Sequence, residues 1–330
     1  MRVLFIGGTG IISTCVSRRA VASGIELYLL NRGKHPVEIE GARRITADID
    51  DRKAVAAALG DLEFDAVVDW VAFVPEHVER DLELFRKRTK QYVFISSASA
   101  YEKPPRSHVI TESTPLRNPY WDYSRNKIAC EDRLLSEYRQ SGFPVTVVRP
   151  SLTYDSVLPI AIGGWGCATL LDRLLAGRPI IVHGDGTSLW TVTHAEDFAK
   201  GFVPLLGHPR SLGQTYHITS DEVMTWNQIY ETIAEALGVT ANIVHIPSDF
   251  IAEVEPAMAG GLLGDKAHSA IFDNTKIKTL VPDYVATIPF HVGIRRTIQW
   301  FRADASRWVV RPDVHAAMDR IIAAWQSKRC

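Results

Sequence analysis

The start of the chain joins a short apolar run to a cluster of glycines and then to a helical pattern. Residues 2–6 (Arg-Val-Leu-Phe-Ile) have strand character, Gly7-Gly8-Thr9-Gly10 follows at once, and residues 11–23 have the pattern of a helix. Glycine allows a tight turn and lets a pyrophosphate approach the helix N-terminus, where free N–H groups favour negative charge. This predicts the first unit of a dinucleotide-binding sheet. Ser13 replaces the third glycine of G-x-x-G-x-x-G, so an ordinary glycine turn is the alternative.

Strand and helix patterns then alternate up to Val145–Arg149, with further strands at 26–30, 67–72 and 92–95. Such alternation predicts a parallel sheet covered on both faces, with ligands beyond the carboxyl ends of the strands. After Pro150 the pattern becomes irregular. The predicted fold is α/β, a Rossmann-type doubly wound parallel sheet with a smaller C-terminal α/β substrate domain. We expect residues 1–155, with about 190–210, to form the NAD(P)-binding domain and residues 156–189 and 211–330 to form the substrate domain.

The end of the second strand bears on the choice of dinucleotide. A carboxylate there would bind the ribose hydroxyls of NAD, but this chain has Asn31-Arg32, with Lys34 close by. An arginine can pair with the 2′-phosphate of NADP, so NADP is slightly favoured and NAD stays open; a solvated loop charge is the alternative. Asp48-Ile49 is predicted to border the adenine, and the end of the fourth strand, Val71-Ala72, to lie over the dinucleotide.

A second motif lies near the middle of the chain. The segment Tyr123-Ser-Arg-Asn-Lys127 lies about twenty-five residues after Ser96-Ser97. A tyrosine and a lysine four apart on a helix project from one face, so the ammonium can lower the pKa of the phenol and make it a usable acid or base. Together with the glycine turn, this motif predicts a hydride-transfer enzyme.

In these motifs the chain resembles the extended short-chain dehydrogenases/reductases, a family that includes UDP-galactose 4-epimerase. The resemblance covers residues 1 to about 300 and also includes Tyr101, Arg149-Pro150, Gly184-Asp185-Gly186 and the segment 194–197. It implies that Tyr123 is the acid/base for a substrate hydroxyl, that Lys127 holds the ribose and depresses the tyrosine pKa, and that Ser97 hydrogen-bonds the reacting oxygen. The predicted cofactor-binding residues are Gly7, Gly10, Ile11, Ile12, Asn31, Arg32, Asp48, Ile49, Val71, Ala72, Tyr123, Lys127 and Pro150.

Departures from the family pattern narrow the chemistry. Dehydrating members carry an Asp-Glu pair where this chain has Ala98-Ser99, so simple oxidation, reduction or epimerisation through a transient ketone is favoured. After the Gly-Asp-Gly turn, Thr187–Trp190 replaces the arginine that clamps a diphosphate, so a sugar or sugar phosphate becomes as plausible as a UDP-sugar. The predicted substrate contacts are Phe73, Ser99, Trp121 and Trp190. In the loop 259–266, Lys266 could reach an anionic group, although solvated loop charges are the simpler interpretation.

The balance of charged residues limits which partners the chain can bind. With 37 basic and 38 acidic residues, the chain has a net charge of −1 and no electrostatic footprint for nucleic acid or an anionic membrane. We expect no metal site and a cytoplasmic location, because the four cysteines are scattered without metal-ligand or disulfide spacing. We expect no membrane span, because no apolar run is long enough to cross a bilayer. By resemblance a homodimer is expected, built from the Tyr123 helix and a helix over about 76–90, with contributions from Leu82, Phe85, Leu134 and Leu135.

Three functions therefore stay open at the level of sequence. The first is a sugar epimerase that keeps its cofactor bound while a ketone turns over. The second is a dissociable dehydrogenase or reductase acting on a carbohydrate alcohol. The third is a catalytically silent nucleotide- or RNA-binding protein, because the chain also resembles, more distantly, the plastid stem-loop RNA-binding proteins of this superfamily.

Overall fold

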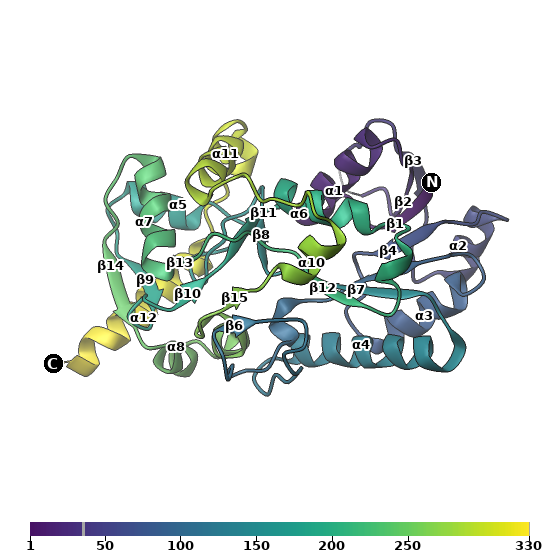
Figure 1. Cartoon of the computed structure of the whole chain (residues 1–330). Helices are drawn as coiled ribbons and strands as arrows, with labels where there is room; N and C mark the ends of the chain where they lie inside the picture. Colours follow the sequence, from purple (N-terminus) through teal and green to yellow (C-terminus); the bar gives the residue numbers. More distant parts are fainter. Residues whose placement is uncertain (35–36, 330) are drawn as a thin grey trace.

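The computed structural model describes residues 1–34 and 37–329 and is built on one large parallel sheet. The sheet has seven strands, in the order β12-β7-β5-β4-β1-β2-β3, and every neighbouring pair is parallel. Their bounds are β12 Thr215–His217, β7 Val145–Arg149, β5 Tyr92–Ile95, β4 Ala66–Asp69, β1 Arg2–Ile6, β2 Glu26–Asn31 and β3 Arg43–Thr46. The central strands are apolar because helices bury them on both sides (Figure 1).

Each face of the sheet has its own hydrophobic core. On one face, α1 (Ile11–Ala22) and α6 (Ala195–Phe202) contribute Val16, Ala20, Phe198 and Phe202. On the other, α2 (Arg52–Leu59), α3 (Pro75–Phe85) and α4 (Asp122–Ser141) contribute Val55, Val78, Leu82, Phe85, Cys130 and Leu134. The predicted Rossmann-type doubly wound sheet is therefore confirmed.

The rest of the chain forms a second cluster of elements beyond the sheet, seen at the left of Figure 1. Its two-stranded pairs are β8 (Leu152–Tyr154) with β11 (Val192–His194), β9 (Ile180–His183) with β14 (Ile243–Ile246), β10 (Leu189–Trp190) with β13 (Met224–Thr225), and β15 (Ile271–Phe272) with β6 (Val109–Ile110). Its helices are α5 (Thr169–Leu175), α7 (Trp226–Leu237), α8 (Ser248–Val254), α9 (Ala259–Gly261), α11 (Phe290–Arg302) and α12 (Pro312–Arg329). A third core, containing Ile180, Trp190, Trp226, Ile294 and Met318, holds them together.

Three boundaries differ from the sequence-based prediction. The fourth strand ends at Asp69 and not at Ala72, because the Asp69 carboxylate accepts hydrogen bonds from the Val71 and Ala72 N–H groups and turns the chain. The helix expected over 76–90 ends at Phe85. Strand β12 and helix α10 (Thr275–Leu280) were expected in the substrate domain, but β12 is an edge strand of the large sheet and α10 places Ile277 in its core.

No helix among residues 1–34 and 37–329 has the length and apolar character needed to cross a membrane.

Candidate active site

A pocket of about 550 Å³ lies at the carboxyl ends of β1, β2 and β4. Its wall contains seven of the residues predicted to bind a cofactor, namely Gly7, Gly10, Asn31, Arg32, Asp48, Ile49 and Val71. Phe73, His77 and Arg80 line it from the segment after β4 and from α3. Of the other predicted cofactor residues, Ile11 and Ile12 are half-buried in the first turn of α1, whereas Ala72 and Pro150 are buried.

The glycine turn fits a dinucleotide. Gly7 and Gly8 have φ values of +95° and +90°, which favour glycine, and a Cβ added at Gly8 would lie 2.6 Å from Leu29. The departure at Ser13 also has a physical reason, because the Ser13 hydroxyl oxygen accepts a hydrogen bond from the Gly10 N–H at 2.8 Å. Gly10 is the N-cap of the twelve-residue helix α1. The backbone is therefore bare where a pyrophosphate would approach a helix N-terminus.

The far end of this pocket is basic. Arg32 and Lys34 are exposed, and neither is paired with a carboxylate within the described part of the chain. The Asn31 side-chain oxygen accepts a hydrogen bond from the Gly33 N–H at 3.0 Å, which holds the turn that carries Arg32. These cations are available to an anionic group bound in the pocket.

The three predicted catalytic residues lie near one another. Ser97 caps the short 3₁₀ helix η1 (Ala98–Ala100) after β5, and Tyr123 lies in the first turn of α4. The Ser97 hydroxyl lies close enough to Tyr123 to influence its pKa. Ser99 lies behind Ser97, with its hydroxyl 2.9 Å from that of Ser97, and it accepts a hydrogen bond from the Ser124 hydroxyl at 2.7 Å. Because Ser99 is only 3% exposed, it supports Ser97 and is not a free substrate contact.

Lys127 is buried beneath this group. Its ammonium donates hydrogen bonds to the Ala72 carbonyl at 2.6 Å and to the Ile95 carbonyl at 2.7 Å, and lies 4.6 Å from the centre of the Phe73 ring. Burial lowers the pKa of Lys127 to about 8, and the negative charge of Asp69 opposes this effect.

The pKa of Tyr123 does not follow the expectation from sequence. Burial raises the pKa of Tyr123, the nearby Ser97 hydroxyl partly opposes the rise, and the charge of Asp265 adds to it. The expected lowering by Lys127 is not seen here, because the ammonium is directed at two backbone carbonyls and lies 5.8 Å from the centre of the Tyr123 ring. A polar substrate group at the Tyr123 hydroxyl would therefore act on a phenol that burial keeps protonated.

Trp121 packs beside Tyr123, with ring centres 4.8 Å apart. Across from it, α9 and the π-helix η5 (Leu262–Lys266) approach so closely that a Cβ at Gly260 would lie 2.5 Å from the Trp121 ring. The expected loop with solvated charges is therefore an ordered helical segment, with Leu262 buried and Lys266 mostly covered.

Asn118 joins the two sides of this region. Its amide donates to the Ser99 carbonyl at 2.8 Å and to the Gly264 carbonyl at 2.6 Å. Sequence reasoning missed Asn118, although an asparagine between prolines just before the predicted catalytic helix was a visible signal. The contact fixes η5 against the segment that carries Ser97.

Two predicted contacts need correction. Trp190 is 1% exposed and packs on Trp226, with ring centres 5.3 Å apart, so its face is not free for a sugar. Of the side chains proposed for a dimer, Leu82, Phe85 and Leu134 are buried in the core between the sheet and its own helices, and Leu135 is half-buried. Leu82, Phe85 and Leu134 are therefore not available to a second subunit. No cluster of three metal-ligating side chains occurs in the part of the chain that the structure describes.

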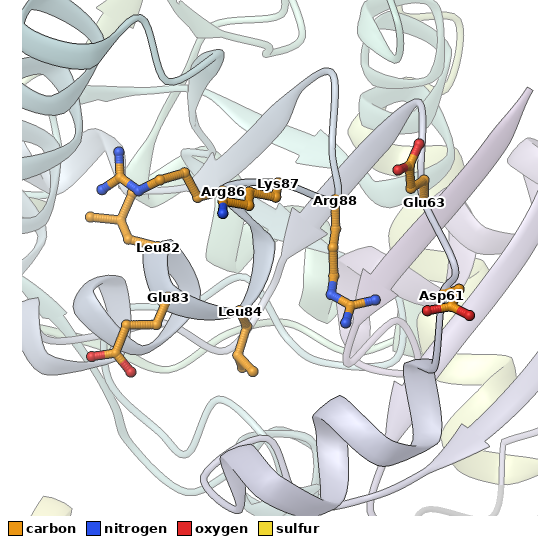
Figure 2. A pocket seen from close by; sticks show the side chains of 8 residues that line it. All are labelled: Asp61, Glu63, Leu82, Glu83, Leu84, Arg86, Lys87 and Arg88. Carbon is orange, nitrogen blue, oxygen red and sulfur yellow. The ribbon is translucent and has the colours of Figure 1, made fainter.

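A second hollow, of about 430 Å³, lies at the C-terminal end of α3 (Figure 2). Its lining includes Asp61, Glu63, Glu83, Arg86, Lys87 and Arg88. These residues precede β5 and so lie toward the amino ends of the parallel strands, away from the edge at which sheets of this kind bind ligands. The hollow is not part of the candidate site.

A model of the NAD dependent epimerase/dehydratase family matches residues 3–219. Among curated proteins, 2'-dehydrokanamycin reductase of Streptomyces kanamyceticus is 26% identical over 86% of this chain and 80% of its own length. UDP-glucose 4-epimerase of Lactobacillus helveticus is 30% identical over 85% of this chain and 91% of its own length. The chloroplast stem-loop binding protein of 41 kDa b from Arabidopsis thaliana is 27% identical over 76% and 67%.

A solved structure shares the fold. UDP-glucose 4-epimerase of Thermus thermophilus in complex with NAD superposes with a TM-score of 0.71 at 21% identity, over 92% of this chain and 99% of that chain. Three observations point to the same family. They are the glycine turn, the pocket at the carboxyl ends of the strands and the match over residues 3–219. The chain belongs to the NAD dependent epimerase/dehydratase family and is an enzyme of the extended short-chain dehydrogenase/reductase type.

Proposed function

We propose that this enzyme moves hydride between a bound nicotinamide dinucleotide and a hydroxyl-bearing carbon of a carbohydrate, as an epimerase or as an oxidoreductase. The observation that carries the proposal is the grouping of Ser97, Tyr123 and Lys127 beside the glycine-lined pocket. The names of two relatives, a dehydro-kanamycin reductase and a UDP-glucose epimerase, support a carbohydrate substrate.

Each of the three residues has a distinct task in this proposal. Tyr123, protonated at rest, gives its proton to the substrate oxygen as hydride reaches the carbon. In the oxidative direction its tyrosinate form takes the proton of the substrate hydroxyl as hydride leaves. Ser97, which lies close to Tyr123, shares the charge that develops on the substrate oxygen. Lys127 holds the ribose and places a positive charge on the same helix as Tyr123. The dinucleotide, when bound, supplies or accepts the hydride.

We propose Gly7, Gly10 and the first turn of α1 as the pyrophosphate site, and Asp48 and Ile49 as the border of the adenine. NAD suits the family as a whole, and the free cations Arg32 and Lys34 support a preference for NADP. Arg32→Ala should weaken NADPH binding at least about tenfold more than NADH binding, as expected for one lost phosphate pair. An equal loss for both dinucleotides would remove the preference.

The main test combines the bound nucleotide with one pair of variants. Tyr123→Phe should lose nearly all turnover and still bind the dinucleotide, whereas Tyr120→Phe, an exposed tyrosine nearby, should keep both. Retained turnover in Tyr123→Phe would contradict the mechanism. Nucleotide released by denaturation and identified by mass should be stoichiometric for an epimerase that recycles its cofactor, and absent for an exchanging dehydrogenase.

Three further expectations are retained as proposals. These are the division into a dinucleotide-binding and a substrate-binding domain, a cytoplasmic location, and a homodimer. The dimer would use the outer faces of α3 and α4, because their inner faces are already buried. Light scattering of the purified protein tests the dimer directly, and a monomeric mass would exclude it.

A second candidate function is binding of RNA without turnover. The observation that favours it is the match to the chloroplast stem-loop binding protein. The net charge of −1 speaks against it. A salt-sensitive shift of a stem-loop RNA in a gel, together with no turnover in the presence of either dinucleotide, would favour this function over the enzymatic one.

A further inference from the structure

Asp69 ends β4, is fully buried and contacts Val71 and Arg80, which line the dinucleotide pocket. One of its carboxylate oxygens accepts hydrogen bonds from the Val71 N–H at 2.5 Å and the Ala72 N–H at 2.8 Å. The other accepts from the Arg80 guanidinium at 3.2 Å. A buried carboxylate that accepts from three donors is held in one position.

Arg80 belongs to α3 and is 3% exposed. Besides Asp69 it binds Asp81 at 2.9 Å and Asp50 at 2.6 Å, and Asp81 accepts a hydrogen bond from the Tyr92 hydroxyl at 2.5 Å. Burial and the neighbouring charge of Asp69 raise the pKa of Asp81 well above its ordinary value. Asp69 is therefore anchored to α3 through a cation that Asp81 and Asp50 also share.

The residue that Asp69 fixes is also the residue that holds Lys127. Ala72 gives its N–H to Asp69, and its carbonyl accepts the hydrogen bond from the Lys127 ammonium at 2.6 Å. Lys127 has no carboxylate within ion-pair distance in the described part of the chain. A buried ammonium without a direct partner depends on the nearest fixed negative charge.

The other groups that face Lys127 supply less of that charge than Asp69 does. On its own helix, Glu131 is bound by Arg149 at 2.5 Å, and burial raises the pKa of the Cys130 thiol to about 12. Tyr123, the rings of Phe73 and Phe94, and the carbonyl of Ile95 complete its surroundings. Arg80 and Asp81 lie behind Asp69.

We propose that Asp69 is a positioning residue for Lys127: it fixes the Ala72 carbonyl that holds the ammonium, and it supplies the negative charge that the buried ammonium otherwise lacks. This inference rests on the proposed role of Lys127 in binding the ribose and supporting Tyr123. In this role Asp69 acts through Ala72 and Lys127 and does not contact the substrate.

Asp69→Asn is the direct test, because an amide oxygen can still accept from Val71 and Ala72 while the charge is lost. Lys127 should then lose its proton at lower pH. The alkaline limb of kcat/KM should move down by about one pH unit, about a tenfold loss on that limb. Asp81→Asn is the matched control. Asp81 is also a buried acid bound to Arg80, but it is not among the charges that shift the pKa of Lys127. The alkaline limb of kcat/KM for this variant should stay at its wild-type position.

A binding measurement separates this inference from the proposed function. The dissociation constant of NADH or NADPH is followed by fluorescence as the pH is increased. In Asp69→Asn it should begin to rise at a lower pH than in the wild type or in Asp81→Asn. If no variant and no wild-type sample turns over any sugar, the proposed function fails, but this pH dependence still decides the role of Asp69. Identical binding and rate profiles for the two asparagine variants would overturn the inference.

Asp69→Glu covers the case in which Asp69→Asn does not fold. Glutamate keeps the charge but moves the carboxylate by one methylene. The alkaline limb should remain at its wild-type position, while kcat falls because the Ala72 carbonyl is displaced. If the alkaline limb of kcat/KM moves in Asp69→Glu although the charge is retained, the charge of Asp69 does not control Lys127.

Discussion

Replacing Lys127 by methionine should remove a large pH dependence from the stability of the fold. Lys127 is 2% exposed, and burial lowers its pKa from the ordinary 10.5 to about 8. Because one pH unit corresponds to about 1.4 kcal/mol, the protonated side chain is disfavoured in the folded chain by about 3 kcal/mol relative to the unfolded chain.

The direction follows from where the proton is held. Between about pH 8 and 10.5 the unfolded chain keeps the proton on Lys127 and the folded chain has lost it. The free energy of unfolding therefore gains about 3 kcal/mol from Lys127 as the pH rises through this window, and the full penalty is present below about pH 8. The raised pKa values of the buried thiols Cys15 and Cys130 act in the opposite direction. Only the difference between wild type and variant isolates Lys127.

The assay is urea unfolding of the wild type and Lys127→Met at about pH 7 and about pH 10. The stability of the wild type minus that of the variant should be about 2–3 kcal/mol larger at the higher pH. Lys53→Met, which replaces an exposed lysine of α2, controls for the loss of a lysine as such. Equal differences at the two pH values would refute the argument that burial disfavours the ammonium.

Three other substitutions test separate parts of the structure. Gly8→Ala should abolish dinucleotide binding measured by fluorescence, because the new Cβ would lie 2.6 Å from Leu29 and the φ of Gly8 is +90°. Unchanged binding would contradict the proposal that the glycine turn binds the dinucleotide. Asn118→Ala should raise KM for the substrate several-fold and leave dinucleotide affinity unchanged, since it frees η5; a change in dinucleotide affinity alone would argue against this role. Glu131→Ala should cost about 3–5 kcal/mol in urea unfolding by leaving Arg149 buried without a partner, and a loss below about 1 kcal/mol would contradict that.

The sheet could be predicted from sequence because its signals are local. An apolar strand, a glycine turn and a helix follow one another within the first 22 residues, and the structure has them in that order. The end of β4 could not be predicted in the same way. Asp69 stops the strand through hydrogen bonds to its own backbone and through Arg80 on α3, and a run of apolar residues shows neither contact.

Side chains that pack across elements were the main source of error. Trp190 has the chemistry of a sugar-binding residue, but its partner Trp226 comes from a helix far along the chain and takes up its face. In the same way Leu82 and Leu134 belong to amphipathic helices, and only the packing of α3 and α4 on the sheet shows that the apolar faces are already covered. Amphipathicity marks a face that must be buried, without saying what buries it.

The same distinction explains why the sequence predicts the chemistry better than the substrate. Tyr123 and Lys127 lie on one helix, so their relative position follows from the four-residue spacing. The surface beside Tyr123 depends instead on Asn118 reaching Gly264 across 146 positions in the chain, and on Trp121 meeting Gly260. The shape of this surface is therefore set by contacts between distant segments. Changes within 259–266 should alter substrate preference while leaving the dinucleotide pocket, which lies at the ends of β1, β2 and β4, intact.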